Sequence, residues 1–298
     1  MLTRGSKLQT ATFEELDSSD SASFEELYRI YEATFPLADE REPADAFGAI
    51  LALNRDRRVQ FTYGPYREVV SAIHAWEGGP VIGGHVFGIT TSSAHLAFGV
   101  PASVQAIYTF LHEDCRGALP IGAVADYSRK VASRVFGAGA SAQLRPPPIL
   151  FEVNNPLRMT KDEIALDTQH SGVDPFRRYM FWLRSGFAPL SFPYVQPRLR
   201  IDAEPVRYLD LFCSNHGPQG IPAALLLNHL YAFISISVLK DRDAREDPDF
   251  IAMKGWLADR ESVGFVDKHG PDMVEIAERA VTARAHAKRS EVRNVEHD

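Results

Sequence analysis

Hydrophobic residues recur at steps of three and four along much of the chain, which is the period of a helix with one buried face. Phe24, Leu27 and Tyr31 begin the first such stretch. Further on, Pro175 suits the first turn of a helix and Gly186 suits the end of one. The pattern predicts helices over residues 24–35, 43–54, 121–132, 175–185, 221–240, 249–260 and 272–291.

Runs rich in β-branched and aromatic residues, bounded by glycine and proline, lie between these helices and are typical of strands. The first two runs read as a hairpin, because the glycine-rich residues 77–80 separate them. From residue 215 onward we expect helices only. The predicted strands cover residues 69–76, 81–90, 104–112, 149–153, 187–190 and 206–213, and residues 94–99 form a further short strand or a loop.

The distribution of polar residues and of predicted strands and helices divides the chain into three parts. Residues 1–20 are polar and rich in Ser and Asp, so we predict a loosely held N-terminal arm. Residues 21–214 carry the alternation of strands and helices that predicts an α/β domain. Residues 215–298 form an α-helical C-terminal extension, which could instead serve as a dimerisation element, so a homodimer is one predicted assembly.

Composition narrows the classes of function. With 298 residues, 45% of them apolar, the chain can bury one sizeable core plus an appendage, and its net charge of −7 argues against a nucleic-acid partner. The longest apolar stretch, residues 221–239, is interrupted by Asn228 and His229, so we read it as a buried helix and predict no membrane span. Cys115 and Cys213 lie far apart with no ligand partners at metal spacing, so we expect no metal site, and a reducing, cytoplasmic location.

Residues 108–122 are the segment that we expect to bind a ligand. A strand, Tyr108-Thr109-Phe110-Leu111, leads through a short turn with Gly117 into a helix. Free backbone N–H groups at such a helix start form an anion site ready for a diphosphate. The same layout also occurs wherever an α/β core turns a corner, so the segment alone leaves both readings open.

The order of four motifs resembles the GNAT superfamily of acyl-coenzyme A N-acyltransferases over residues 20–215. The segment from Tyr108 to Gly122 is similar to its coenzyme A loop, Phe151-Glu152-Val153-Asn154-Asn155 to its fifth strand, and Phe181-Trp182-Leu183-Arg184-Ser185-Gly186-Phe187 to its helix ending in Gly-Phe. Residues 27–41 resemble its first helix and following loop. The resemblance implies a mixed, mostly antiparallel sheet flanked by helices.

It also implies a function: transfer of an acetyl or longer acyl group from acetyl-CoA or another acyl-CoA to the amine of a small molecule, by direct attack on the thioester. A backbone N–H near Leu111 would polarise the thioester carbonyl. The residues that the resemblance assigns to coenzyme binding are Phe110, Leu111, His112, Arg116, Gly117, Ala118, Leu119, Ile121, Gly122 and Asn155.

The sequence departs from the family pattern in two places, the loop and the later helix. Leu119 stands where the first loop glycine is expected, and Pro120 has no N–H to donate, so the phosphate cradle has one contact fewer. Trp182 stands where many members have a tyrosine that protonates the departing thiolate, and an indole cannot act as that acid. These departures support the alternative of a catalytically inactive coenzyme A sensor or partner-binding protein.

Three residues are candidates for proton transfer. Glu152 on the predicted fifth strand is a candidate base, although a strand glutamate is often solvent-facing or ion-paired. His112 at the end of the fourth strand is another, unless it only caps the turn. Tyr179 offers a hydroxyl one turn before Trp182, or else packs against the sheet.

Two further segments border the expected site. The acids of residues 157–178, Asp162, Glu163, Asp167 and Asp174, suggest a negatively charged lid that favours a cationic acceptor, or an ordinary charged helix face. The aromatic residues 192–197 read as a rigid loop at the pocket mouth, or as a cover at a domain boundary.

Overall fold

The computed structural model describes residues 11–35, 41–54, 65–137, 144–199, 203–214, 220–240 and 242–295, with residues 285–295 only as helical backbone. Half of the predicted N-terminal arm, residues 1–10, therefore lies outside the described residues. The other half includes strand β1, Thr12–Glu15, which pairs with the next strand and is not a loose arm. None of the described helices is both long enough and apolar enough to cross a bilayer.

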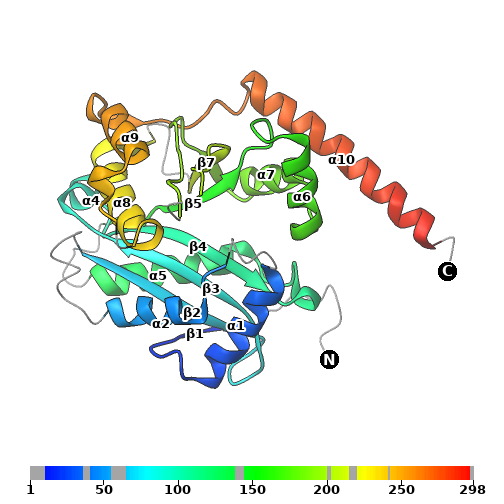
Figure 1. Cartoon of the computed structure of the whole chain (residues 1–298), viewed down its shortest axis with the longest axis horizontal. Coiled ribbons are helices and arrows are strands. Elements are labelled where there is room, and N and C mark those ends of the chain that lie inside the picture. Colours follow the sequence, from blue (N-terminus) through cyan, green and yellow to red (C-terminus); the bar gives the residue numbers. More distant parts are fainter. Residues whose placement is uncertain are drawn as a thin grey trace.

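The centre of the fold is a seven-stranded sheet in the order β1-β2-β3-β4-β5-β7-β6 (Figure 1). Every neighbouring pair is antiparallel except β4 with β5. The predicted hairpin, the fourth and fifth strands and the closing strands are all present. Their bounds are Tyr66–His74 for β2, Val81–Thr90 for β3, Ser103–Leu111 for β4, Ile149–Asn154 for β5, Phe187–Pro189 for β6 and Leu209–Ser214 for β7.

The parallel pair β4 and β5 separates soon after it begins. Only Val104 with Ile149 and Gln105 with Leu150 are in register, and beyond these positions both strands continue without pairing to each other. Thr109, although it lies on a central strand, is exposed as a result. We call the space between the two strands beyond Gln105 and Leu150 the split.

A β-bulge lies at the start of the split. Val86 pairs with Tyr108 and the next residue, Phe87, pairs with Ala106, so Ile107 is the extra residue on β4. Bulges re-aim side chains and are common beside functional sites. Here the bulge places Ile107 and Tyr108 at the mouth of the split.

Helices cover the two faces of the sheet. The α1 face packs α1 (Ala22–Thr34), α2 (Ala44–Leu53), α8 (Ala223–Phe233) and α9 (Pro248–Ala258) around apolar side chains that include Val86 and Leu150. The opposite α5 face packs α5 (Ile121–Phe136), α7 (Pro175–Arg184) and the first half of α10 (Pro271–Val295) around Val104 and Phe151. Because strand residues alternate between faces, Leu150 and Glu152 point to the α1 face.

The C-terminal region does more than extend the domain. Leu225, Leu226 and Leu230 of α8 are fully buried in one cluster with Leu150 and Leu211 of the sheet. In Figure 1, α8 and α9 lie beside α4 at one end of the molecule, whereas α10 packs against α7 and then extends away. The segment predicted as a separate helical extension therefore shares the core of the sheet.

Two sequence predictions were wrong in this part of the fold. Residues 94–99 form helix α4, Ser93–Phe98, and not a strand or loop; it ends at Gly99, whose left-handed φ of 77° terminates it. Downstream of residue 215, Ile221–Pro222 (β8) and Ser262–Val263 (β9) pair as a small sheet. A ladder this short leaves no periodic signal in the sequence.

Candidate functional site

Two cavities meet at the split. The large cavity, about 1050 Å³, is lined from β4, from α6 (Lys161–Ser171), from α7 and from α10. The small cavity, about 670 Å³, opens on the α1 face between α2, the sheet and the segment after α8. Ile107, Tyr108 and Glu152 line both. The two cavities therefore share a wall at the split.

Glu152 lies at this junction. Its neighbours Phe151 and Val153 are buried on the α5 face, while its own side chain is partly exposed towards the cavities. Burial raises the pKa of Glu152 to about 7, against the opposing effect of a hydrogen bond that it accepts from the Tyr194 hydroxyl. A carboxyl group that titrates near neutrality can accept a proton and release it again.

The backbone of β4 presents free donors to the split. The His112 amide donates to the Ile82 carbonyl on β3 (2.8 Å), and amides alternate in direction along a strand. The amides of Leu111 and Thr109 therefore point away from β3, towards the unpaired side. The N–H expected near Leu111 is thus available at the split.

The turn before α5 also keeps free amides. Ala118 donates to the Cys115 carbonyl (3.0 Å), but within the described part of the chain the amides of Gly117, Leu119, Ile121 and Gly122 have no acceptor. Gly117 has a left-handed φ of 77°, and a Cβ there would meet nothing within 4 Å. The helix start is open as an anion site requires, although Pro120 at its N-cap offers no donor.

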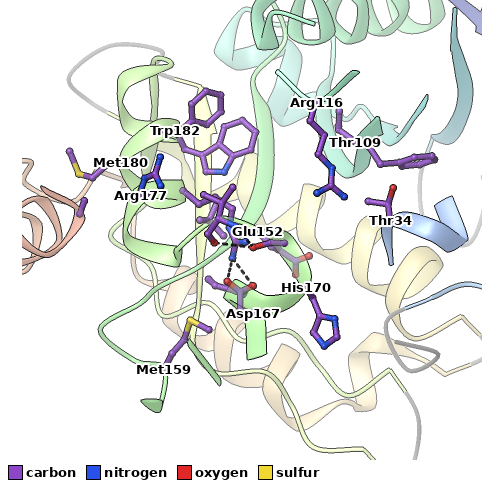
Figure 2. A pocket seen from close by; sticks show the side chains of 18 of the residues that line it. Thr34, Thr109, Arg116, Glu152, Met159, Asp167, His170, Arg177, Met180 and Trp182 are labelled. Atoms are coloured by element: carbon purple, nitrogen blue, oxygen red, sulfur yellow. Dashed lines mark hydrogen bonds and ion pairs between the residues drawn. The ribbon is translucent and has the colours of Figure 1, made fainter. Parts of the chain in front are cut away.

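Arginines line the large cavity. Arg178 is paired with Asp167 (2.7 Å), whereas Arg116, Arg177 and Arg184 have no carboxylate partner among the described residues. Figure 2 shows Arg116 and Thr109 on one side of the cavity and Trp182, Met180 and Arg177 on the other, with Glu152 between them. Guanidinium groups without a carboxylate partner are the donors that phosphate oxygens prefer.

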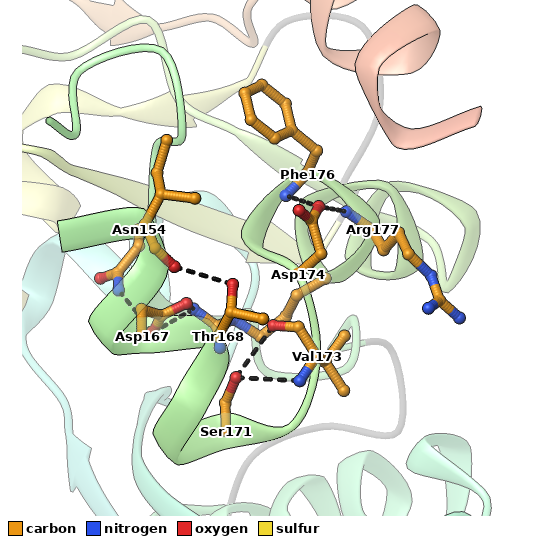
Figure 3. Close-up of polar contacts among 10 residues, drawn as sticks. Asn154, Asp167, Thr168, Ser171, Val173, Asp174, Phe176 and Arg177 are labelled. Atoms are coloured by element: carbon orange, nitrogen blue, oxygen red, sulfur yellow. Dashed lines mark hydrogen bonds and ion pairs between the residues drawn. The ribbon is translucent and has the colours of Figure 1, made fainter. Parts of the chain in front are cut away.

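Three of the four acids predicted to form a negative lid make helix caps or ion pairs within the fold, and Figure 3 shows two of them, Asp167 and Asp174. Asp174 caps α7 by accepting from the amides of Phe176 and Arg177 (3.0 and 3.3 Å), and Asp167 holds Arg178 and accepts from Asn154. The Glu163 side chain closes a capping box at the start of α6. Of the four acids, only the Asp162 carboxylate has no such bond within the described structure.

Two of the three proton-transfer candidates lie away from the cavities. The Tyr179 hydroxyl donates to Asp210 Oδ2 (2.6 Å) inside the core, and burial raises its pKa. His112 caps the short helix Glu113–Cys115 by accepting from the Asp114 amide (3.4 Å). Neither residue lines the large or the small cavity: His112 caps a turn, and Tyr179 packs in the core against Phe212.

The predicted coenzyme-binding residues are not all brought together. Phe110, Leu111, Arg116 and Gly117 line the large cavity. The side chains of Ala118 and Leu119 pack with Cys115 in a small apolar cluster, and Ile121 packs on the α5 face. Asn155 is buried and donates to Asp210 Oδ2 (2.9 Å), while His112 and Gly122 lie outside the cavity lining.

Several residues at the two cavities were not singled out as site residues. Tyr194, from the aromatic segment 192–197, is fully buried and donates to Glu152. On the small cavity, Glu68 comes from β2, and Ser235 and Ser237 come from the segment that follows α8. The sequence gives little indication of these residues, because one acid in a strand and two serines in an apolar helix do not form a motif with a recognisable spacing.

No family model matches the chain, and no curated protein matches it. Solved structures do match. A Bacteroides thetaiotaomicron protein described as a GNAT-family acetyltransferase is 14% identical and aligns over 76% of this chain and 98% of its own, with a TM-score of 0.45. An aminoglycoside 6'-N-acetyltransferase complexed with coenzyme A is 11% identical over 68% and 94%, with a TM-score of 0.38.

A spermidine N-acetyltransferase from Vibrio cholerae, in complex with CoA and spermine, is 11% identical over 68% of this chain and 93% of its own, with a TM-score of 0.35.

The fold class predicted from the sequence is observed directly: a mixed, mostly antiparallel sheet with helices on both faces. In the order of its motifs and in this class of fold, the chain resembles the GNAT superfamily of acyl-coenzyme A N-acyltransferases.

Proposed function

We propose that the protein is an acyl-coenzyme A-dependent N-acyltransferase that acts on the amine of a small molecule. One observation carries the proposal: Glu152, with a pKa of about 7, lines both cavities where they meet at the split. The large cavity takes the coenzyme, and the small cavity takes the acceptor. The carboxylate then lies where the two substrates approach each other.

The residues of the large cavity fit a coenzyme A molecule. Gly117 of the cavity lining leads into the start of α5, where the free amides of Leu119, Ile121 and Gly122 lie outside the lining itself and suit the diphosphate. Arg116, Arg177 and Arg184 of the lining are further donors. The unpaired edge of β4 suits the peptide-like pantetheine arm, which can hydrogen-bond as an added strand would. Apolar side chains exposed on the α6 to α10 side, Leu166, Phe181 and Val281, offer packing surface.

When bound, an acyl-coenzyme A supplies a thioester whose C–S bond breaks as the C–N bond to the amine forms. The Leu111 or Thr109 amide donates to the carbonyl oxygen as negative charge develops on it. Glu152 takes the proton that the amine gives up, directly or through water, and the coenzyme leaves as a thiolate that takes a proton from water. Tyr194 holds the carboxylate by donating to its Oε1.

Steady-state turnover tests the proposal. We expect purified protein to release free thiol from acetyl-CoA, or from a longer acyl-CoA, only when an amine is added, with kcat/KM rising with pH through about 7 as Glu152 loses its proton. Glu152→Gln should lower kcat by about 100-fold or more, the usual contribution of a general base. Coenzyme binding without turnover for any of a broad panel of amines and acyl lengths would contradict the proposal.

That contrary outcome is the one that the inactive-sensor alternative predicts. Pro120 at the N-cap of α5 and Trp182 in place of an acidic hydroxyl favour this alternative. The Trp182 ring packs edge-on against Phe187 and lines the large cavity, so its place in the fold is that of a cavity wall. Calorimetry with acetyl-CoA separates binding from turnover, since a sensor binds and an enzyme also turns over.

A further inference from the structure

We propose that the end of the small cavity remote from Glu152 is a subsite for a second cationic group of the acceptor, formed by Glu68 with Tyr66 and Ser237. The acceptor would then be a diamine-like molecule, with one amine at Glu152, an apolar middle and an ammonium at Glu68. This inference rests on the proposed function for the role of Glu152, but the subsite itself is built from other residues.

Glu68 is a buried carboxylate that is held firmly in place. Its side chain is 3% exposed, and its backbone N–H and C=O both bond to the side chain of Asn54 (3.0 and 2.6 Å). The hydroxyls of Tyr66 and Ser237 both reach its Oε2, at 3.1 and 2.9 Å. Among the described residues no group donates to Oε1, so that oxygen is left for a donor from the cavity.

The carboxylate has no cation of its own in the described structure. Lys240, the cationic side chain that lines the small cavity, is engaged by Glu42, with Nζ 2.6 Å from Oε2. Burial raises the pKa of Glu68 to about 7, against the opposing effects of its two hydrogen bonds and of the charge on Lys240. Buried acids are normally paired, so an unpaired one beside a cavity is a place for a positively charged ligand.

The backbone beside Glu68 is specialised. Residues Ile234–Val238 form a π-helical turn in which the Leu239 amide donates to the Ile234 carbonyl at 2.7 Å. Such turns are rare in proteins as a whole, and those that occur are often found at functional sites. This one lines the cavity with four successive residues, from Ser235 to Val238.

An ammonium group matches the open side of Glu68. It offers three donors and no acceptor, which suits the carboxylate oxygen Oε1 that no described residue bonds. Ser235 lies outside this contact, because residues two apart in a helical turn face opposite ways and Ser237 is the one that bonds Glu68.

The position of Glu68 sets the length of the acceptor. The strand register aligns Glu68 on β2 with Leu150 on β5, through Gly88 and Gln105 on the two strands between them. Glu68 therefore lies three strands away from β5. Along the strand direction it is level with Leu150, two residues before Glu152. At about 4.8 Å between strands and about 3.3 Å per residue, the two Cα atoms are roughly 16 Å apart. Much of the lining of the small cavity is apolar: Phe47, Ile50, Leu53, Phe233, Ile236 and Val238.

The test compares linear α,ω-diamines with monoamines of the same length, from four to twelve carbons, in turnover with acetyl-CoA and in calorimetry without it. We expect the longer diamines to have KM and Kd values about 10- to 100-fold below those of the matched monoamines, the effect of one charge-assisted contact. Glu68→Gln should remove this preference, so that the KM of a diamine rises to that of the matched monoamine. Glu77→Gln, a change at an exposed turn residue, is the matched control.

The outcomes separate the two proposals. Equal values for diamines and monoamines, or a preference that survives Glu68→Gln, would overturn the subsite. Preferential diamine binding that depends on Glu68, without any turnover, would support the subsite and remove the proposed acyl transfer. If Glu68→Gln does not fold, Ser237→Ala, which removes a donor to Glu68 Oε2, gives the second reading, and an undiminished diamine preference in that variant would also count against the subsite.

Discussion

Replacing Glu152 with glutamine should lower activity and raise stability at the same time. Glutamine keeps the shape of the side chain and can still accept from Tyr194, but it does not titrate. In the folded protein the pKa of Glu152 is about 7, against 4.5 for an ordinary glutamate. The folded state therefore holds a proton that the unfolded chain has already released between these two values.

The sign of the effect follows from this difference. Below pH 4.5 both states carry the proton, and above about pH 7 neither does, so the free energy of unfolding of the native protein falls as pH rises through this window. At about 1.4 kcal/mol per pH unit, the loss attributable to Glu152 approaches about 3 kcal/mol. Because the side chain is partly exposed to the cavities, this is the largest value we expect.

Urea denaturation at pH 5 and pH 8 measures the effect. Relative to the native protein, Glu152→Gln should gain about 2 to 3 kcal/mol in unfolding free energy between the two pH values, while its kcat falls by about 100-fold or more. Glu77→Gln, at an exposed position, should show neither change. If the unfolding free energy of Glu152→Gln depended on pH as that of the native protein does, the raised pKa of the buried carboxyl would be refuted. If its kcat were that of the native protein, the role of Glu152 as the base would be refuted.

Two further predictions concern the cavity and its support. Arg116→Ala should raise the Kd for coenzyme A in calorimetry by about tenfold or more, since an unpaired guanidinium is lost from the proposed phosphate site, while Arg29→Ala at an exposed surface pair leaves it unchanged. A native Kd for the Arg116 variant would place the phosphates elsewhere. Tyr179→Phe should keep kcat within about twofold but lose about 1 to 3 kcal/mol of unfolding free energy, because buried Asp210 loses a donor. A large loss of kcat with native stability would instead make Tyr179 catalytic.

Much of the fold was accessible from the sequence because its signals are local. Asp174 followed by Pro175 predicts the start of α7, and the structure has that cap. The run around Phe151 predicts β5, and alternation along it gives the face of Glu152. The end of α4 at Gly99 and the short pairing of β8 with β9 carry too few residues for a periodic signal.

The second half of the site depends on contacts between distant segments. Glu68 and Ser237 are separated by 169 positions in sequence, and Tyr194 and Glu152 by 42, so no spacing rule relates them. The π-helical turn at Ile234–Val238 has the composition of an ordinary apolar helix. The cytoplasmic location and the homodimer stay predictions of the sequence.

A crystal structure with bound acetyl-CoA tests the central claim most directly. We expect the pantetheine arm between β4 and β5, the diphosphate at the free amides that open α5, and the thioester at the junction that Glu152 shares with the small cavity. Density for the coenzyme outside the split, with the thioester remote from Glu152, would contradict the account.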